Sequence, residues 1–122
     1  MTHVLVIDDE TAVRAFIRQT LEAEGYQVSE ATDGEEGLTA LQTTSADLII
    51  TDIFMPNKEG IETIWTVHKQ FPQIKILAIS GGGKHKLTHS LPEALQFGAH
   101  HTLAKPFTPN ELAEAVAATL HG

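Results

Sequence analysis

Short apolar runs alternate with longer segments of helical periodicity along the whole sequence, and this alternation constrains the fold. The first, third and fourth runs are strongly apolar, and the second is more polar. Strands that are apolar on both faces and are joined by helices form parallel sheets covered on both sides. We therefore expect an α/β fold with a doubly wound, five-stranded parallel sheet and helices on both faces. The expected strands cover 3–7, 27–31, 47–51, 75–80 and 100–104, and the expected helices begin near residues 11, 33, 61, 90 and 108.

Length, charge and composition exclude several classes of protein. The 122 residues suit one domain, residues 1–122. Sixteen acidic against eight basic residues give a formal net charge of −8, which disfavours direct binding to nucleic acid and to anionic lipid. No apolar run has the roughly 18 residues of a membrane helix, and the N-terminus lacks the features of a signal peptide. The absence of cysteine excludes disulfides and thiol chemistry. We expect a cytoplasmic protein.

Side chains able to do chemistry collect where the expected strands end. In parallel sheets, ligands bind beyond the carboxyl ends of the strands. We therefore expect one shared site at that edge of the sheet. Its members are Asp8 and Asp9 after the first strand, Asp52 after the third, Ser80 at the end of the fourth, and Lys105 after the fifth.

Three carboxylates at one site repel one another and need compensating charge. At ~4 Å and an effective dielectric constant of about 20, each close pair costs roughly 4 kcal/mol. Lys105 supplies one positive charge. A Mg²⁺ or Mn²⁺ ion would supply two more and would accept oxygen ligands from the carboxylates. The acidic residues therefore predict a divalent metal site.

A carboxylate beside a metal and a lysine suggests phosphoryl transfer. Asp52 is a candidate nucleophile, because aspartate can form an aspartyl-phosphate. The metal and Lys105 would neutralise charge on the transferred group, and Ser80 would hold one of its oxygens. Phosphoryl transfer depends mainly on positioning and electrostatics, and these residues provide both.

Each of these residues also has a purely structural interpretation. Asp8 and Asp9 could cap the first helix, Asp52 could form a turn, and Lys105 could be a solvated loop charge. Taken singly, these interpretations have similar weight. The joint occurrence at four strand ends favours a shared site.

The sequence motifs resemble the receiver domain of two-component response regulators. The matching stretches are IDDE at 7–10, DIFMP with Gly60 at 52–60, Ser80, and KPF at 105–107, in order along nearly the whole chain. The resemblance implies a flavodoxin-like (βα)5 fold. It also implies a conformational switch or phosphorelay intermediate that catalyses only its own phosphorylation and dephosphorylation. The implied partners are a histidine kinase or histidine phosphotransfer protein as donor and a downstream protein target.

The resemblance also implies roles for individual residues. Asp52 would be the phosphoacceptor, Lys105 would contact the phosphoryl group, and Ser80 would be the switch hydroxyl. The peptide bond between Lys105 and Pro106 would be cis. Mg²⁺ would be bound by Asp9, Asp52 and the backbone carbonyl of Phe54, with Asp8 assisting directly or through water.

Two departures from the family pattern concern the switch. The family often has an aromatic residue three positions before the lysine, where this chain has Thr102. A rotating aromatic that follows the hydroxyl inward therefore cannot operate in that form. The segment from Ser80 to Gly98 is also a few residues longer than the common pattern, and its glycines suggest a mobile loop followed by a shortened helix.

Two other functions fit parts of the sequence. A metal-dependent phosphatase would use an aspartyl-phosphate, but such enzymes typically carry Asp-x-Asp on the first strand, whereas here Asp8 and Asp9 are adjacent. A flavin carrier on the same sheet would need a phosphate-cradling loop after the first strand, where this chain is acidic. Gly81–Lys84 does not fit the phosphate-loop spacing, His85 and His89 lack a third metal ligand, and Trp65 is expected to pack in the core or at its edge.

Overall fold

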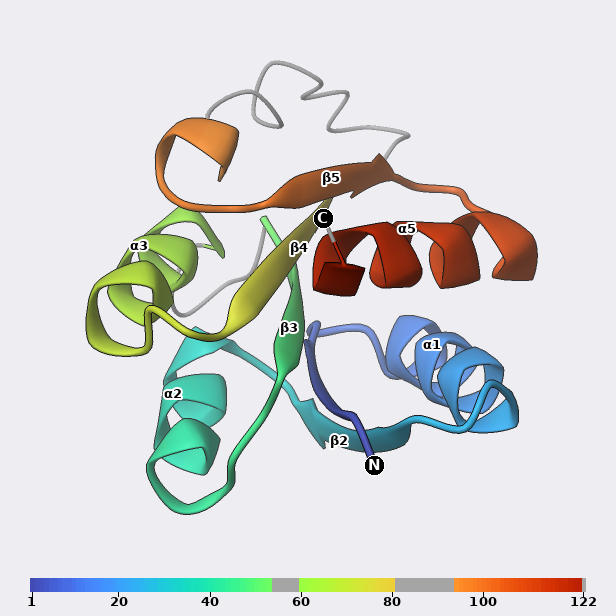
Figure 1. Cartoon of the computed structure of the whole chain (residues 1–122), viewed down its shortest axis with the longest axis horizontal. Helices are drawn as coiled ribbons and strands as arrows, with labels where there is room; N and C mark the ends of the chain where they lie inside the picture. Colours follow the sequence, from blue (N-terminus) through green and yellow to red (C-terminus); the bar gives the residue numbers. More distant parts are fainter. Residues whose placement is uncertain (54–59, 81–93, 122) are drawn as a thin grey trace.

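The computed structural model describes residues 1–53, 60–80 and 94–121 and contains one parallel five-stranded sheet, as expected (Figure 1). The strand order is β2-β1-β3-β4-β5. The strands are β1 (His3–Ile7), β2 (Gln27–Ala31), β3 (Leu48–Asp52), β4 (Lys75–Ser80) and β5 (His101–Ala104). The helices are α1 (Thr11–Ala23), α2 (Gly34–Thr43), α3 (Gly60–Gln70) and α5 (Pro109–His121), and residues 94–96 are also helical.

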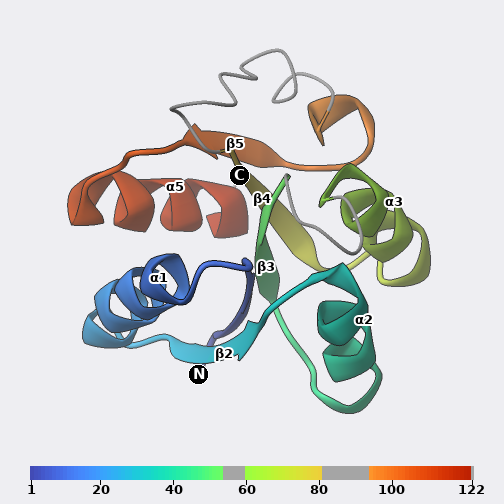
Figure 2. The same ribbon diagram turned by 180° about the vertical axis from the view of Figure 1, so that it is seen from behind.

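The helices cover both faces of the sheet, which confirms the doubly wound arrangement. Helices α1 and α5 lie side by side on one face, and α2 and α3 lie on the other, as both views show (Figures 1 and 2). Alternate residues of β1 serve the two layers: Leu5 and Ile7 pack towards α2 and α3, and Val4 and Val6 pack towards α1 and α5. Burial of each such side chain contributes roughly 1.5–3 kcal/mol. The sheet is therefore buried between two layers of helices.

The strand order reverses between β1 and β3. From β1 the chain crosses to β2 at one edge, and the later strands are added on the other side of β1. Crossovers that leave in opposite directions open a crevice at the carboxyl ends of the two central strands. The residues that end β1 and β3 therefore lie at the position where this class of fold binds ligands.

Capping hydrogen bonds between side chains and the backbone begin two of the helices, α5 and α2. At α5, Glu111 N–H donates to Thr108 Oγ1, and Thr108 N–H donates to Glu111 Oε1, at 3.1 and 2.8 Å. At α2, Glu36 N–H donates to Asp33 Oδ1, while the Glu36 carboxylate accepts from Thr32 N–H, one residue earlier than in the standard motif. These bonds satisfy backbone donors that the first turn of a helix leaves unpaired.

Two strand boundaries differ from the expectation by one residue. Strand β3 includes Asp52, whose backbone pairs with Ile79 of β4, so this carboxylate is carried by the strand and not by the following loop. Strand β5 begins at His101 and not at residue 100. His100 Nδ1 accepts a hydrogen bond from Ile76 N–H at 3.0 Å, so its side chain takes the place of a backbone acceptor there.

No helix within the described residues is both long enough and apolar enough to span a bilayer. The expected helix near residue 90 begins outside the described residues, as does the long segment that follows Ser80.

Candidate functional site

Lys105 joins carboxylates from separate parts of the chain at the carboxyl edge of the sheet. Its Nζ atom lies 3.1 Å from Asp8 Oδ2, 3.1 Å from Asp52 Oδ2 and 3.5 Å from Glu10 Oε1. The chain supplies these groups from the end of β1, the end of β3 and the segment after β5. The expected meeting of Asp8, Asp52 and Lys105 at one site is confirmed.

Asp8, Asp9 and Asp52 form an acidic cluster. Each offers a carboxylate oxygen, and these three oxygens lie within 4.8 Å of one another. Asp8 and Asp52 are buried, whereas Asp9 is exposed. Two buried and crowded carboxylates are costly unless positive charge is nearby, and Lys105 provides part of it.

The structure does not support helix capping by Asp8 or Asp9. Glu10 occupies the N-cap position of α1, and its side chain makes no capping hydrogen bond in the described structure. Asp8 Oδ1 instead accepts a 2.8 Å hydrogen bond from Glu10 N–H, which fixes the turn before the helix. Because no cap explains the two adjacent aspartates, the shared-site interpretation gains weight.

Arg14, which the sequence does not single out, holds the acidic turn in place. Its Nη1 donates to the carbonyl oxygen of Asp8 at 2.6 Å, and its Nε donates to Glu30 Oε1 at 3.0 Å. Arg18 donates to the other oxygen of the Glu30 carboxylate at 2.8 Å. The arginine is one turn into α1 and Glu30 is on β2, so only the packing of α1 against β2 reveals this contact.

The surroundings of Gly60 explain why the sequence motif that begins at Asp52 ends in a glycine. A Cβ atom at this position would lie 2.1 Å from the carbonyl oxygen of Asp52 and 2.4 Å from Ile53 Cα. Gly60 N–H also donates to Ile53 O at 2.8 Å. The first turn of α3 therefore packs directly against the end of β3, and this contact positions Asp52.

The remaining predicted site residues have mixed outcomes. Ser80 is buried at the end of β4, one residue after Ile79, which pairs with Asp52. The Ser80 carbonyl oxygen accepts a hydrogen bond from Lys105 N–H at 2.8 Å. The peptide bond between Lys105 and Pro106 is cis, which confirms that prediction. Phe54 lies outside the described residues, as do Gly81–Lys84, His85 and His89.

Burial raises the pKa of Asp8 from the ordinary 3.8 to about 6. The Glu10 backbone N–H and the Lys105 ammonium lower it in part, and the charge of Asp52 raises it further. For Lys105, burial alone would lower the pKa, but the carboxylates of Asp52 and Asp8 outweigh burial and raise it. The ammonium group therefore stays charged at neutral pH.

Comparison with known proteins agrees with this geometry. The sequence model of the response regulator receiver domain matches residues 4–117. The chain belongs to this family. Receiver domains are the phosphoacceptor domains of two-component systems, and this chain is such a receiver, with its acidic cluster at the strand ends. The phosphatase and flavin-carrier alternatives lose their support.

Relatives of two kinds are similar to this receiver. The chemotaxis protein CheY of Thermotoga maritima is 32% identical over 114 residues, which cover 93% of this chain and 92% of CheY. The KDP operon transcriptional regulatory protein KdpE of Escherichia coli is 37% identical over 112 residues, which cover 92% of this chain and 48% of KdpE. The chain therefore spans about half the length of such transcriptional regulators and nearly all of CheY.

Solved structures show the same fold. Chemotaxis protein CheY4 of Vibrio cholerae aligns with a TM-score of 0.89 and 32% identity, covering 98% of this chain and 99% of that chain. A CheY-like receiver domain protein from Methanospirillum hungatei aligns with the same TM-score and identity, covering 99% of this chain and 94% of that chain.

Proposed function

We propose that this receiver accepts its phosphoryl group on Asp52 and that residues 1–122 act as one receiver domain. The observation that carries the proposal is the 3.1 Å contact between Asp52 Oδ2 and Lys105 Nζ, beside the carboxylates of Asp8 and Asp9. Asp52 is the buried carboxylate at the end of a central strand, where α/β sheets bind ligands.

The transfer from a phosphohistidine needs only one exchange of bonds. An Asp52 carboxylate oxygen attacks phosphorus, and the new P–O bond forms as the P–N bond breaks. The bonding pair leaves with the imidazole nitrogen, which takes a proton from solvent. Lys105 stabilises the negative charge on the phosphoryl oxygens, and Ser80 acts as the switch hydroxyl on the neighbouring strand. Hydrolysis of the acyl phosphate restores Asp52, so the chain catalyses only its own phosphorylation and dephosphorylation.

The acidic cluster fits a Mg²⁺ or Mn²⁺ ion. Three carboxylates and one ammonium group give a formal charge of −2, which a divalent ion balances, and oxygen donors suit these metals. We assign Asp9 and Asp52 as ligands, with Asp8 assisting because both of its oxygens already accept hydrogen bonds. The backbone carbonyl of Phe54 is included as a ligand only because of the family resemblance. When bound, the ion would neutralise charge on the transferred group.

An apolar groove beside Lys105 suits the phosphoryl donor. It has a volume of about 310 Å³ and adjoins the acidic cluster through Lys105. Phe16 of α1 and Phe107, whose ring centroids are 5.9 Å apart, contribute to its walls. Receivers interact with histidine kinases, and a helix that bears the phosphohistidine could bury apolar side chains here and present phosphorus to Asp52. The remaining lining residues are Ala12, Val13 and Pro106.

Incubation with acetyl phosphate and Mg²⁺ tests the phosphoacceptor. Intact mass spectrometry should show one added phosphoryl group on the wild type and none on Asp52→Asn. Asp47→Asn is a matched control, because Asp47 lies just before the other end of β3 and accepts from His3 N–H; this variant should be phosphorylated like the wild type. Equal phosphorylation of Asp52→Asn, or phosphorylation of the wild type in EDTA at the same rate, would contradict the proposal.

A further inference from the structure

Large apolar side chains are exposed on α3, within the helical residues 94–96 and on the turn that follows them. Trp65, Leu95 and Phe97 are 45%, 49% and 36% exposed, and they make up three of the five exposed large apolar side chains among the described residues. The Trp65 and Phe97 rings meet edge to face, with centroids 5.8 Å apart and planes at 88°. We call Trp65, Lys69, Leu95 and Phe97 the aromatic surface.

The backbone holds this aromatic surface in a fixed shape. Gly98 has a φ of +127°, and a Cβ atom there would lie 2.7 Å from the side chain of His68 on α3. Ala99 N–H donates to Ala94 O at 2.9 Å and closes the turn that carries Leu95 and Phe97. These contacts preform the turn, which lowers the entropy lost on binding, and tryptophan is enriched among residues that dominate interface energies.

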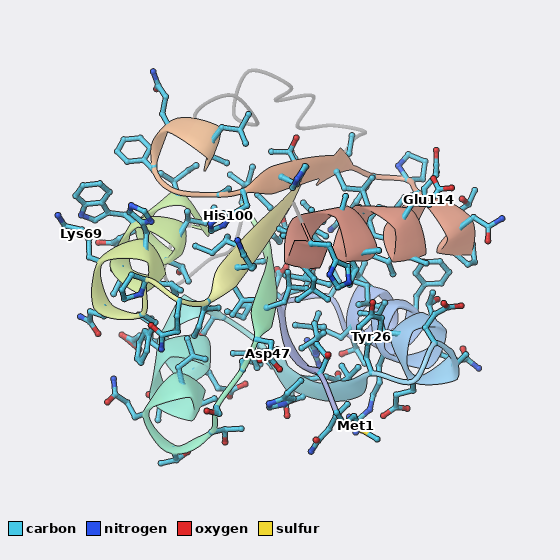
Figure 3. The ribbon with its side chains drawn as sticks, in the orientation of Figure 1. Met1, Tyr26, Asp47, Lys69, His100 and Glu114 are labelled. Atoms are coloured by element: carbon cyan, nitrogen blue, oxygen red, sulfur yellow. The ribbon has the colours of Figure 1, made fainter. Side chains whose placement is uncertain are left out.

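The charges of the chain are segregated along the sequence, and the aromatic surface lies in the basic part. Residues 63–110 carry five of the eight lysine and arginine residues and one of the sixteen acidic residues, a formal charge of +4. The rest of the chain has three bases and fifteen acids, a formal charge of −12. In Figure 3, Lys69 and His100 lie on the α3 side of the molecule, whereas Glu114 lies on α5 at the opposite side.

Positive charge also lies directly at the aromatic side chains. Lys69 Nζ is 4.9 Å from the centre of the Trp65 ring, at cation–π distance. The acidic residue of α3 is Glu62, one turn before Trp65. A ligand at this surface would therefore meet an aromatic centre with Lys69 beside it and Glu62 one turn away.

We infer that the aromatic surface binds an acidic protein segment that carries apolar side chains. The apolar side chains would cover Trp65 and Phe97, and an acidic one would pair with Lys69, which adds steering and specificity. A nucleic acid or an anionic membrane is a poorer fit, because the formal charge of −12 on the rest of the chain would repel a long polyanion. The inference does not depend on which residue accepts the phosphoryl group.

A library of random 16-residue peptides, displayed on phage, provides a defined probe. Peptides that bind the Lys69→Glu/Phe97→Ala double variant are removed first, and the remaining peptides are then selected for binding to the wild type. Enriched peptides should carry net negative charge and at least two large apolar residues. A labelled peptide should bind at least tenfold more weakly to Lys69→Glu and to Phe97→Ala, and more weakly at high salt, by fluorescence anisotropy. It should also change the emission of Trp65, the only tryptophan.

Phe16→Ala is the matched control, because Phe16 is also 36% exposed but belongs to the groove at α1; this variant should bind the peptide like the wild type. All variants should still accept phosphate from acetyl phosphate, which shows that they fold. Basic enriched peptides, no enrichment, or equal binding to Phe97→Ala would overturn the inference. Quenching of Trp65 emission by a 20-base-pair DNA duplex would also overturn the inference, because the surface would then bind nucleic acid. A dimer in sedimentation that the Lys69→Glu substitution dissociates would do the same, because the surface would then bind a second copy of the chain.

Discussion

Asp8 is the residue at which the cost of the acidic cluster is most visible. It is fully buried, and both of its carboxylate oxygens accept hydrogen bonds, from Glu10 N–H and from Lys105 Nζ. These contacts do not compensate for burial, because the pKa of Asp8 is still raised to about 6. Ionised Asp8 therefore costs folding free energy when no metal is bound.

In EDTA, the wild type should lose stability as the pH rises through this range. The pKa of Asp8 is about 6 in the folded protein and ordinarily 3.8. The folded state therefore binds the proton more tightly, and this stabilisation is complete below about pH 3.8 and is lost as the pH rises through 6. A difference of about two pKa units corresponds to roughly 2–3 kcal/mol. Urea unfolding of the wild type and Asp8→Asn at several pH values measures it.

Asp8→Asn should be more stable than the wild type at pH 7.5, and the free energies of unfolding of these two proteins should converge near pH 4. Glu114→Gln removes one negative charge from an exposed position of α5 and serves as the control; its free energy of unfolding should stay parallel to that of the wild type. A constant difference between wild type and Asp8→Asn across the pH range would contradict the raised pKa.

The chemistry of single residues was predictable where the strand ends carry it. Asp8, Asp52 and Lys105 follow from their places at the ends of β1, β3 and β5, because parallel strands bring those ends together. Arg14 was not predictable, since its contacts with the Asp8 carbonyl and Glu30 depend on how α1 lies on β2. The one-residue shift in the start of β5 was not predictable either, because the ring of His100 replaces a backbone acceptor.

At the level of elements, the contact between β3 and α3 sets the position of the strand that carries Asp52. Gly60 lies so close to Asp52 O and Ile53 Cα that a methyl group would overlap the backbone. A backbone cannot move aside as a side chain can. A larger residue must therefore displace either the end of β3 or the first turn of α3.

Gly60→Ala should therefore lower the free energy of unfolding by about 3 kcal/mol or more and slow phosphorylation by acetyl phosphate. Gly37→Ala is the matched comparison. A Cβ atom there would meet only the Ile7 side chain, whose Cδ1 would be 2.5 Å away. That side chain can shift, and alanine gains ~1 kcal/mol of helix propensity inside α2, so the loss should be about 1 kcal/mol or less. Urea unfolding compares them, and equal losses would contradict the backbone clash.

The elements themselves were largely predictable. Within the described residues, the helices begin close to the predicted residues 11, 33, 61 and 108. Pro109 occupies the first position of α5, and α1 ends before Gly25, which has a φ of +95°. The order of the strands could not be read from periodicity, because it depends on the direction of each crossover. The family resemblance implied only a flavodoxin-like (βα)5 fold, and the order itself is seen in the sheet.

At the scale of the whole molecule, the net charge and the proposed metal binding are linked. The chain has a formal charge of −8, and three of its carboxylates share one end of the sheet. Any cation relieves general repulsion by screening, whereas a bound divalent ion stabilises only the folded state, in which the three carboxylates meet. The two effects can be separated by comparing salts at equal ionic strength.

Mg²⁺ at ten times its dissociation constant should raise the free energy of unfolding by about 1.4 kcal/mol at pH 7.5, from the linkage between binding and folding. NaCl at the same ionic strength should raise it by a smaller amount. Asp9→Asn removes an exposed member of the acidic cluster and should abolish the extra effect of Mg²⁺ while leaving the effect of NaCl unchanged. The Glu114→Gln control loses the same charge but should respond to Mg²⁺ like the wild type. If NaCl stabilised the wild type as much as Mg²⁺ does, screening alone would explain the result, and the acidic cluster would not be a metal site.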